Sequence, residues 1–187
     1  MRIGVYGSAS GDITAGLAEK ARTIGREIAR LGHVVVTGGC PGLPHEAVLG
    51  AWEEAGLAVG FSPATSAEDH VERIGYPTEG FADMVFVPRS YPLASDPEAC
   101  RKYRNVASVF SVDAAVFIGG GTGTMNEFTI AHDRGVPLGV LADSGGITCG
   151  VIQALLGVIS GPSPPVIFEE DPEALVAAVV EAAGGPG

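Results

Sequence analysis

Positive charge is scarce in this sequence. Lysine and arginine together number 11, against 22 aspartates and glutamates, and the formal net charge at pH 7 is −11. A protein that binds the phosphate backbone of nucleic acid needs a basic face, so we expect no nucleic-acid partner. A small anionic ligand is still compatible with this charge, because a few N–H dipoles and one or two arginines can override the field of the whole protein.

Cysteine is sparse as well. The three cysteines, Cys40, Cys100 and Cys149, lie far apart and form no CxxC pair, and the four histidines have no zinc-like spacing to them. These spacings argue against a disulfide framework and a structural zinc site. We therefore predict no metal and no cofactor, and three free thiols that are buried or half-buried.

Long apolar runs are missing, although the chain is apolar overall. Hydrophobic residues make up 46% of it and the mean hydropathy is +0.30, yet no uninterrupted run approaches the ~20 residues that a membrane helix needs. The first residues enter a strand-like pattern directly, without the charged and apolar regions of a signal peptide. We expect a soluble, cytoplasmic protein with no membrane partner.

The sequence does contain a regular alternation of strand-like and helical segments. Runs rich in valine, isoleucine and alanine predict strands, and apolar residues three or four apart predict helices. The predicted strands are 2–7, 33–36, 57–61, 84–87, 114–118, 137–141 and 165–168. The predicted helices extend over about 17–31, 44–55, 97–110, 149–159 and 172–183, with one more that runs from a glycine-rich stretch to about residue 134.

Repeated strand–helix units imply a mainly parallel sheet with helices on both faces, which is an α/β fold of the Rossmann-like, doubly wound kind. A length of 187 residues is typical of one domain. We expect residues 1–183 to form a single nucleotide-binding domain and residues 184–187 to be a frayed tail. Residues 62–95 are the least regular part of the chain.

Two predicted helix faces can be compared with a structure. One is the apolar face of the helix that has Pro44 in its first turn, and the other is the buried side of the helix that begins at Asp96-Pro97-Glu98. The first face comprises Val48, Trp52 and Ala55, and the second comprises Ala99, Tyr103, Val106 and Phe110.

The most informative stretch is Gly119-Gly120-Gly121-Thr122-Gly123-Thr124-Met125-Asn126-Glu127, which joins a buried strand-like run to a helical pattern. Glycines let the backbone approach a phosphate closely, and free N–H groups at a helix start favour negative charge. We therefore assign phosphate binding to Gly120, Gly121, Thr122, Gly123 and Thr124. Glu127, one turn into the helix, adds a candidate catalytic carboxylate.

Two further glycine turns are predicted at the same edge of the sheet. Gly7-Ser8 ends the first strand and Gly38-Gly39 follows the second. Open α/β sheets bind ligands beyond the carboxyl ends of their strands, so the three turns predict one continuous crevice. We add Gly7, Ser8, Gly38 and Gly39 to the nucleotide-binding residues, while noting that such glycines also permit tight connections.

The familiar nucleotide motifs are absent. The first turn, Gly7-Ser8-Ala9-Ser10-Gly11, has no GxGxxG pattern, and the second strand does not end in the acidic residue that binds a dinucleotide's ribose, which argues against NAD and FAD. Neither Lys20 nor Lys102 follows a glycine loop, so kinase or ATPase chemistry lacks its phosphate-binding lysine.

Residues 119–127 resemble the PGGxGTxxE signature of the Lonely Guy family, the cytokinin riboside monophosphate phosphoribohydrolases, with Gly119 in place of the leading proline. The family also carries an arginine–lysine pair whose arginine lies fifteen residues before that proline. Arg104 stands in this register, and Asn105 replaces the lysine. Residues 38–43 and 58–63 are similar to the family's GGGxxGLM and VIGVIP segments, so the resemblance covers most of residues 1–142.

This resemblance implies an activity, the hydrolysis of the N-glycosidic bond of a nucleoside 5′-monophosphate such as AMP. Arg104 and Glu127 are the implied catalytic residues: Glu127 would stabilise an oxocarbenium-like transition state and orient water, and Arg104 would hold Glu127 ionised. Asn105, at the lysine position, joins the nucleotide-binding residues. The family also implies a homodimer, because its site lies near a dimer interface. Its members are often labelled lysine decarboxylases, but neither lysine here is placed to form a Schiff base.

Several alternatives stay open. Thr124 and Glu127 also have the spacing of a capping box, and Arg101 and Arg104 could form ordinary surface salt bridges. A non-catalytic nucleotide- or molybdenum-cofactor-binding protein, similar to molybdenum-cofactor carrier proteins, is an alternative on the same fold, and the missing lysine at Asn105 favours it. An interaction module with a vestigial site is a third.

Overall fold

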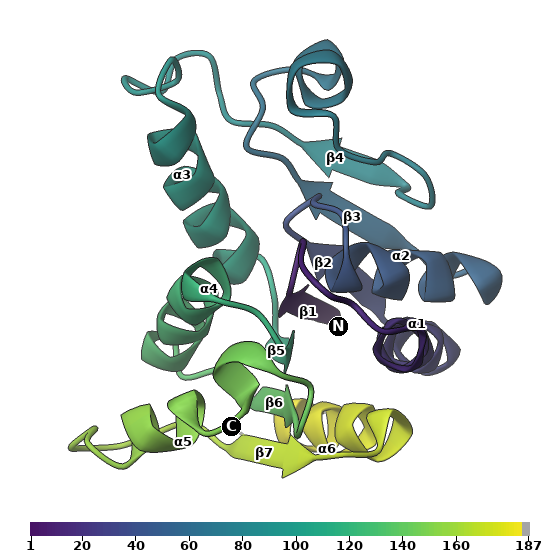
Figure 1. The fold of residues 1–187 in the computed structure, drawn as a ribbon, viewed down its shortest axis with the longest axis vertical. Helices are drawn as coiled ribbons and strands as arrows, with labels where there is room; N and C mark the ends of the chain where they lie inside the picture. Colours follow the sequence, from purple (N-terminus) through teal and green to yellow (C-terminus); the bar gives the residue numbers. More distant parts are fainter. Residues whose placement is uncertain (185–187) are drawn as a thin grey trace.

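The computed structural model describes residues 1–184. Its seven strands form one sheet in which all adjacent pairs are parallel, in the order β4-β3-β2-β1-β5-β6-β7 (Figure 1). This confirms the predicted α/β, Rossmann-like doubly wound fold. The strands are β1 (Arg2–Gly7), β2 (Val34–Thr37), β3 (Ala58–Phe61), β4 (Asp83–Val85), β5 (Ala114–Ile118), β6 (Leu138–Leu141) and β7 (Val166–Glu169).

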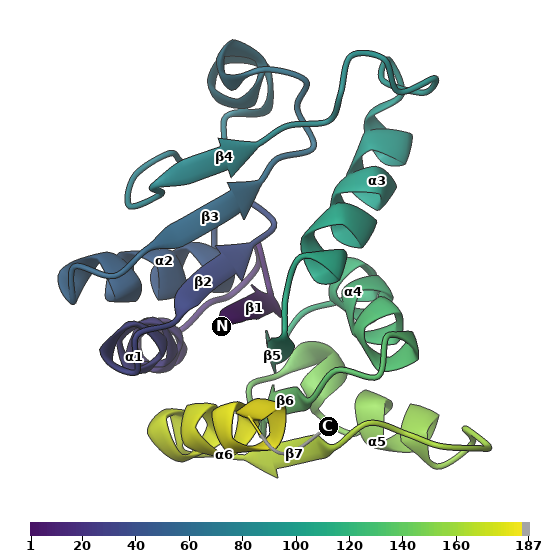
Figure 2. The same cartoon turned by 180° about the vertical axis from the view of Figure 1, so that it is seen from behind.

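Helices cover both faces of the sheet, as Figures 1 and 2 show from opposite sides. On one face lie α1 (Ala15–Arg30), α2 (Leu43–Glu53) and α6 (Pro172–Gly184). On the other lie α3 (Pro97–Phe110), α4 (Thr122–Asp133) and α5 (Val151–Leu156). A π-helix at Asp69–Ile74 precedes β4, and a single 3-10 turn at Gly146–Thr148 precedes α5.

The direction of strand addition reverses at β1. The chain lays down β1 to β4 outward in one direction, and α3 then carries it back so that β5 pairs with the other side of β1. Gly7, at the end of β1, lies beside Ile118 at the end of β5. In open parallel sheets such a reversal leaves a ligand crevice beyond the carboxyl ends of the two strands.

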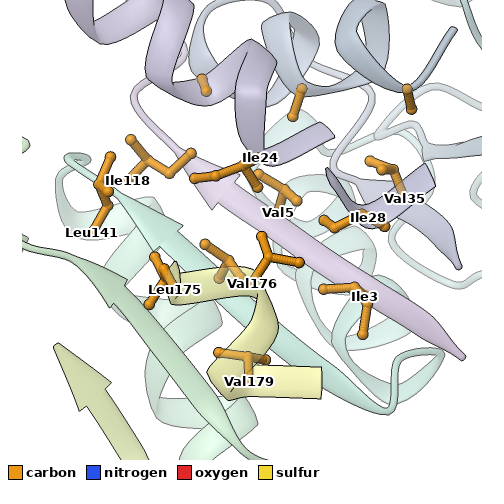
Figure 3. Packing of buried hydrophobic residues seen from close by; sticks show 14 of the residues in the cluster. Ile3, Val5, Ile24, Ile28, Val35, Ile118, Leu141, Leu175, Val176 and Val179 are labelled. Atoms are coloured by element: carbon orange, nitrogen blue, oxygen red, sulfur yellow. The ribbon is translucent and has the colours of Figure 1, made fainter. Parts of the chain in front are cut away.

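The larger hydrophobic core fixes β1 beneath α1, α2 and α6. Ile3 and Val5 of β1 are fully buried against Ile24 and Ile28 of α1 and Val176 of α6 (Figure 3). Burying an aliphatic side chain of this size stabilises a fold by about 1.5–3 kcal/mol. The strand whose end forms the crevice is therefore held in place by a well-packed core.

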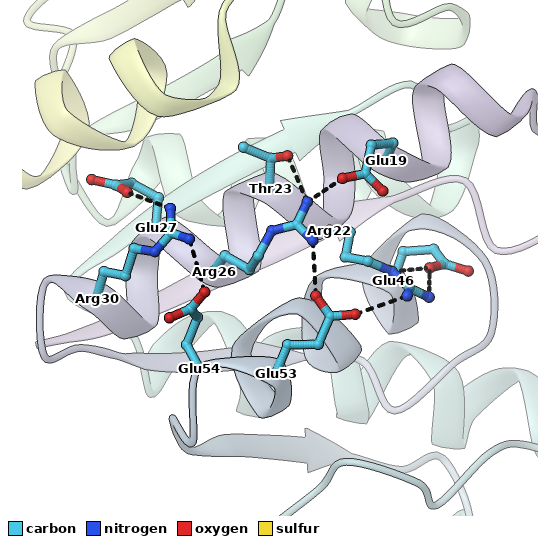
Figure 4. Close-up of polar contacts among 9 residues, drawn as sticks. All are labelled: Glu19, Arg22, Thr23, Arg26, Glu27, Arg30, Glu46, Glu53 and Glu54. Atoms are coloured by element: carbon cyan, nitrogen blue, oxygen red, sulfur yellow. Dashed lines mark hydrogen bonds and ion pairs between the residues drawn. The ribbon is translucent and has the colours of Figure 1, made fainter.

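Helices α1 and α2 cross with their backbones in close contact. An added Cβ at Gly25 would overlap the carbonyl oxygen of Ala47, and one at Gly50 would overlap that of Arg22. On the outer side of this crossing, three arginines of α1 face acidic residues of α2 and of its C-cap, Glu54 (Figure 4). The nitrogen–oxygen distances are 2.7 Å for Arg22–Glu46, 2.8 Å for Arg26–Glu53 and 2.8 Å for Arg30–Glu54.

The predicted buried side of α3 is wrong, because Val106 is 46% exposed and Phe110 is 60% exposed. Polar side chains that form hydrogen bonds occupy much of the buried face. Asn105 donates to the amide oxygen of Asn126 in α4 at 2.9 Å, and Ser108 donates to the carbonyl oxygen of Asn105. The buried residues of α3 are Cys100, Asn105, Ser108 and Val109.

Two smaller predictions also fail. Trp52 is 56% exposed, and Ala55 lies beyond the end of α2 in a turn with a φ of 54°, whereas Val48 is buried as predicted. Cys149 is exposed, while Cys40 and Cys100 are buried free thiols.

The end of the chain and its helix lengths complete the description. Gly184 belongs to α6, and the other residues of the predicted tail, 185–187, lie outside the described residues. None of the helices within residues 1–184 combines the length and the apolar character that crossing a membrane requires.

Candidate functional site

A cleft of about 500 Å³ lies beyond the carboxyl ends of β1, β2 and β5. It has the size of an ordinary small-molecule site. Ten predicted site residues line it: Gly7, Ser8, Gly38, Arg104, Gly120, Gly121, Thr122, Gly123, Thr124 and Glu127.

The glycine loop between β5 and α4 presents a helix start to this cleft. Gly120 has a φ of 90°, and an added Cβ there would overlap the hydroxyl oxygen of Thr124. Gly121 is the N-cap and provides no side-chain cap, and the N–H of Met125 donates to the carbonyl oxygen of Gly121 at 2.9 Å. Because the first N–H groups of a helix have no partner inside it, those of residues 122–124 are suited to binding an anion.

Ser8 supports the glycine loop from β1. Its hydroxyl oxygen accepts a hydrogen bond from the N–H of Gly120 at 2.8 Å, and its own N–H donates to the carbonyl oxygen of Ile118. An added Cβ at Gly7 would overlap that same carbonyl oxygen. The first turn therefore holds the loop in place, and Gly7 allows the two strand ends to meet.

Arg104 and Glu127 form a buried ion pair in the cleft. An Nη of Arg104 lies 3.3 Å from a carboxylate oxygen of Glu127, and the two side chains are 11% and 7% exposed. An added Cβ at Gly38 would overlap the Arg104 guanidinium. Gly38 therefore leaves room for the side chain of Arg104, which extends from α3 to the turn after β2.

The environment of Glu127 shifts its ionisation. Burial raises the pKa of Glu127 from its ordinary 4.5 to about 7, and the nearby positive charge of Arg104 opposes that rise. Burial lowers the pKa of Arg104 and the Glu127 carboxylate raises it, with a net direction upward, so the guanidinium stays charged. A carboxyl group that titrates near neutral pH inside a cleft is suited to general acid–base chemistry.

The capping-box alternative does not fit the observed helix start. Because α4 begins at Thr122 with Gly121 as its N-cap, Thr124 lies inside the helix and Glu127 is directed to Arg104. Arg101, for which we also considered a surface salt bridge, forms one with Glu98 and lines the cleft as well.

Two predicted residues, Gly39 and Asn105, are not among those that line the cleft. Gly39 has a φ of 60°, and its N–H donates to the hydroxyl oxygen of Thr37, which shapes the turn after β2. Asn105 is buried between α3 and α4 on Asn126, and its own amide oxygen has no hydrogen-bond partner. Both lie next to residues of the cleft.

Sequence reasoning missed several other residues that line the cleft, among them Tyr6, Cys40, Pro44 and Tyr76. Burial raises the pKa of the Tyr6 hydroxyl and also that of the Cys40 thiol, with Arg104 opposing the second shift. Tyr76 follows the π-helix and meets the buried ring of His70 edge-on. No local pattern marks these positions, because they meet the cleft only through the tertiary fold.

The imidazole of His70 fixes the segment that carries Tyr76. Its Nδ1 lies 2.8 Å from the hydroxyl oxygen of Ser62, and its Nε2 lies 3.1 Å from the carbonyl oxygen of Pro77. The irregular region thus contributes the aromatic side chain of Tyr76 to the cleft. Within residues 1–184, no group of three or more histidine, cysteine, aspartate or glutamate side chains could hold a metal ion.

The fold and this cleft define a Rossmann-like protein with a glycine loop at the switch point of its sheet, a class that binds nucleotides and related cofactors. Residues 1–176 match the SLOG cluster4 family (LDcluster4), and the chain belongs to this family. A protein of Archaeoglobus fulgidus described as uncharacterized is 33% identical over 135 residues, which are 72% of this chain and 76% of that protein.

Two solved structures share the fold over almost the whole chain. The X-ray structure of TM1055 has a TM-score of 0.74 at 21% identity and covers 96% of this chain and 98% of its own. The molybdenum cofactor binding protein from the phototrophic bacterium Rippkaea orientalis has a TM-score of 0.73 at 23% identity and covers 96% and 95%. At these identities the likeness shows the fold.

Proposed function

We propose that this protein is a cytoplasmic nucleoside 5′-monophosphate phosphoribohydrolase, which releases a free base and ribose 5-phosphate. The observation that carries this proposal is the buried Arg104–Glu127 pair in the same cleft as the glycine loop. An anion on the loop would bring the sugar attached to it close to a carboxylate that titrates near pH 7.

The glycine loop binds the 5′-phosphate in this proposal. The N–H groups of Thr122, Gly123 and Thr124 point along the positive end of α4 and suit a phosphate. Glu127 follows Thr122 by five residues, about 7 Å along the helix axis. This spacing leaves room for a ribose between the loop and the carboxylate.

Hydrolysis then proceeds at the anomeric carbon. The bond from C1′ to the base nitrogen breaks and its electron pair goes to the base, while the oxygen of water forms a new bond to C1′. Glu127 accepts the proton of that water, and its negative charge stabilises the oxocarbenium-like carbon. The leaving base takes up one proton from solvent, and Glu127 then releases the proton that it accepted to solvent. Water is therefore the co-substrate and no redox partner is required.

Arg104 and Tyr76 have the two remaining roles in this proposal. Arg104 keeps part of the Glu127 population ionised at neutral pH, because its positive charge opposes the effect of burial. Tyr76 is the half-buried aromatic residue of the cleft lining, whereas the ring of Tyr6 is fully buried against Phe117. A flat heterocyclic base suits the ring of Tyr76, since stacking tolerates many bases.

The direct test is base release by the purified protein. We expect free base and ribose 5-phosphate from AMP or another monophosphate, and a loss of about 10²–10⁴-fold in rate for Glu127→Gln. Glu181→Gln on α6, an exposed glutamate, is the matched control and should keep full activity. Unchanged turnover in Glu127→Gln would remove the carboxylate from the mechanism.

A non-catalytic binding function is the second candidate. Asn105 replaces the cation of the Lonely Guy pair, and the molybdenum cofactor binding protein of Rippkaea orientalis shares this fold. In that case the protein binds AMP or the molybdenum cofactor tightly and releases no base, and Glu127→Gln leaves the affinity unchanged. A vestigial interaction module would bind neither ligand.

We further propose a homodimer that forms through the exposed face of α3. Tyr103, Val106 and Phe110 share this face, Val106 and Phe110 are exposed, and the ring of Tyr91 lies 4.8 Å from that of Tyr103. Contiguous apolar surface of this kind marks interaction sites. Val106→Asp should turn a dimer into a monomer in sedimentation, whereas Val158→Asp at another exposed valine should not.

A further inference from the structure

The first residue of the glycine loop has a conformation that a proline cannot adopt. Gly119 has a φ of 60°, and its N–H donates to the hydroxyl oxygen of Ser144 at 2.8 Å. Proline fixes φ near −65° and has no N–H. The glycine that stands in place of the Lonely Guy proline therefore anchors the loop by a bond that the proline could not make.

Ser144 belongs to a buried hydroxyl network on the loop after β6. Its Oγ lies 2.6 Å from the carbonyl oxygen of Leu141, to which it donates, and 2.9 Å from the hydroxyl oxygen of Thr148. The single hydroxyl proton of Thr148 has two acceptors within reach, the Ser144 hydroxyl oxygen and the carbonyl oxygen of Gly145 at 2.6 Å. Both hydroxyl side chains are buried, so the network is shielded from exchange with water.

The same loop also holds the next residue of the glycine stretch. The N–H of Ile147 donates to the carbonyl oxygen of Gly120 at 3.0 Å, and an added Cβ at Gly146 would overlap that oxygen. On the other side, the N–H of Gly120 donates to Ser8. The turns after β1 and β6 therefore hold Gly119 and Gly120 between them, and in Figure 1 the chain after β6 curls beside the start of α4.

This arrangement decides which N–H groups remain for a ligand. The N–H groups of Gly119 and Gly120 are both used by serine hydroxyls, so the donors left to the cleft are those at the start of α4. Loss of the Ser144 bond would free Gly119 and let the loop change its φ. The direction of the remaining donors would then no longer be fixed.

We infer that Ser144 is a positioning residue of the anion-binding loop, acting through Gly119 and supported by Thr148. The inference rests on the proposed use of this loop for the 5′-phosphate. It extends the site to a segment, residues 141–148, that touches the ligand only through the loop.

The test compares Ser144→Ala with Ser108→Ala, which removes another fully buried serine hydroxyl, on α3. Calorimetric titration with inorganic phosphate, AMP and adenosine reads out the phosphate-specific part of binding. We expect Ser144→Ala to weaken phosphate and AMP by about tenfold, as when one buried hydrogen-bond partner is lost, and to change adenosine less than twofold. Ser108→Ala should leave all three affinities unchanged.

A second variant protects the test against a failure to fold. Thr148→Val keeps the shape of the side chain and removes the hydroxyl beside Ser144, so it should weaken phosphate binding in the same direction and by less. Wild-type phosphate affinity in Ser144→Ala overturns the inference, and so does an equal loss of adenosine and AMP, which would mean a general loosening.

The outcomes also separate the inference from the proposed function. If the wild-type protein binds phosphate, Ser144→Ala weakens that binding, and no base is released, the hydrolase proposal alone fails. If it releases base but Ser144→Ala binds phosphate normally, the positioning role fails alone. A wild-type protein that binds no phosphate overturns both.

Discussion

The crossing of α1 and α2 and the cleft beyond the strand ends use glycine and charge in opposite ways. Beneath α1 and α2, Gly25 and Gly50 let one helix backbone touch the other. On the cleft side, Gly38 and Gly120 make room for side chains that the site uses, the guanidinium of Arg104 and the hydroxyl of Thr124. The first pair of glycines serves packing, and the second serves a binding geometry.

The charged groups differ in the same way. The arginines of α1 are partly exposed and pair with several acids, whereas Arg104 is buried with one carboxylate at 3.3 Å. Within residues 1–184, four buried side-chain polar atoms lack a partner, and two of them, the Tyr6 hydroxyl and Nε of Arg104, belong to residues that line the cleft. Native proteins leave few such atoms unpaired. Of these four unpaired atoms in the described residues, two therefore belong to the cleft lining, and none belongs to the crossing of α1 and α2.

The largest effect is expected from removing Arg104, the buried cation of the cleft. Arg104→Met leaves Glu127 buried without a partner, so its pKa should rise further above about 7 and base release at neutral pH should fall by about 10²-fold or more. A pH–rate profile measures the shift. Arg30→Met, which removes a partly exposed cation outside the cleft lining, is the control, and a similar shift in both variants would contradict the specific role of Arg104.

An added methyl group at the helix crossing should affect stability but leave binding unchanged. Gly25→Ala places a Cβ against the backbone of Ala47, and such overpacking costs about 1–3 kcal/mol. Gly16→Ala on the same helix meets open space and should instead stabilise the protein slightly. Urea unfolding of both variants, with AMP affinity measured in parallel, checks the prediction. Weaker AMP binding in Gly25→Ala would mean that packing at the crossing of α1 and α2 affects ligand binding in the cleft.

The raised pKa of Glu127 predicts an unusual pH dependence for a carboxyl group. Between pH 4.5 and about 7 the folded state keeps a proton that the unfolded state has lost, so the contribution of this group to stability falls as pH rises through that window. The limit is about 1.4 kcal/mol per pH unit. The free energy of unfolding should therefore decrease more between pH 5 and pH 8 in the wild type than in Glu127→Gln. An equal decrease would place the pKa of Glu127 near its ordinary value.

The smallest effect is expected at the outer ion pairs. Glu54→Gln removes the partner of Arg30, and pairs that are this exposed contribute about 0.2–1 kcal/mol. The loss should shrink in concentrated salt, because exposed charges are screened. Thermal unfolding at low and high salt measures this loss of stability. A large loss that does not depend on salt would contradict the assignment of these pairs as weak surface interactions.

Much of the architecture could be predicted because the spacing of apolar residues along the chain indicates the strands and helices. The alternation of apolar strands and amphipathic helices predicted a parallel sheet. The resemblance to the Lonely Guy family, whose arginine stands fifteen residues before position 119, predicted the pairing of Arg104 with Glu127. The buried side of α3 could not be predicted from apolar spacing, since Asn105 and Ser108 are buried on hydrogen bonds to other groups. Tyr76 and Ser144 were missed for a similar reason. Their roles depend on contacts between segments that no local pattern connects.

The path of α3 has a consequence for how the protein reaches its native state. The same helix carries Arg104 and returns the chain so that Ala114 of β5 can pair with Ile3 of β1, a separation of 111 residues. Contacts between such distant segments form slowly, because the entropy of closing the long loop is lost before the pairing compensates for it. A nascent chain that has made only the first four strands has no cleft, so ligand binding reports that the central strand pair has closed.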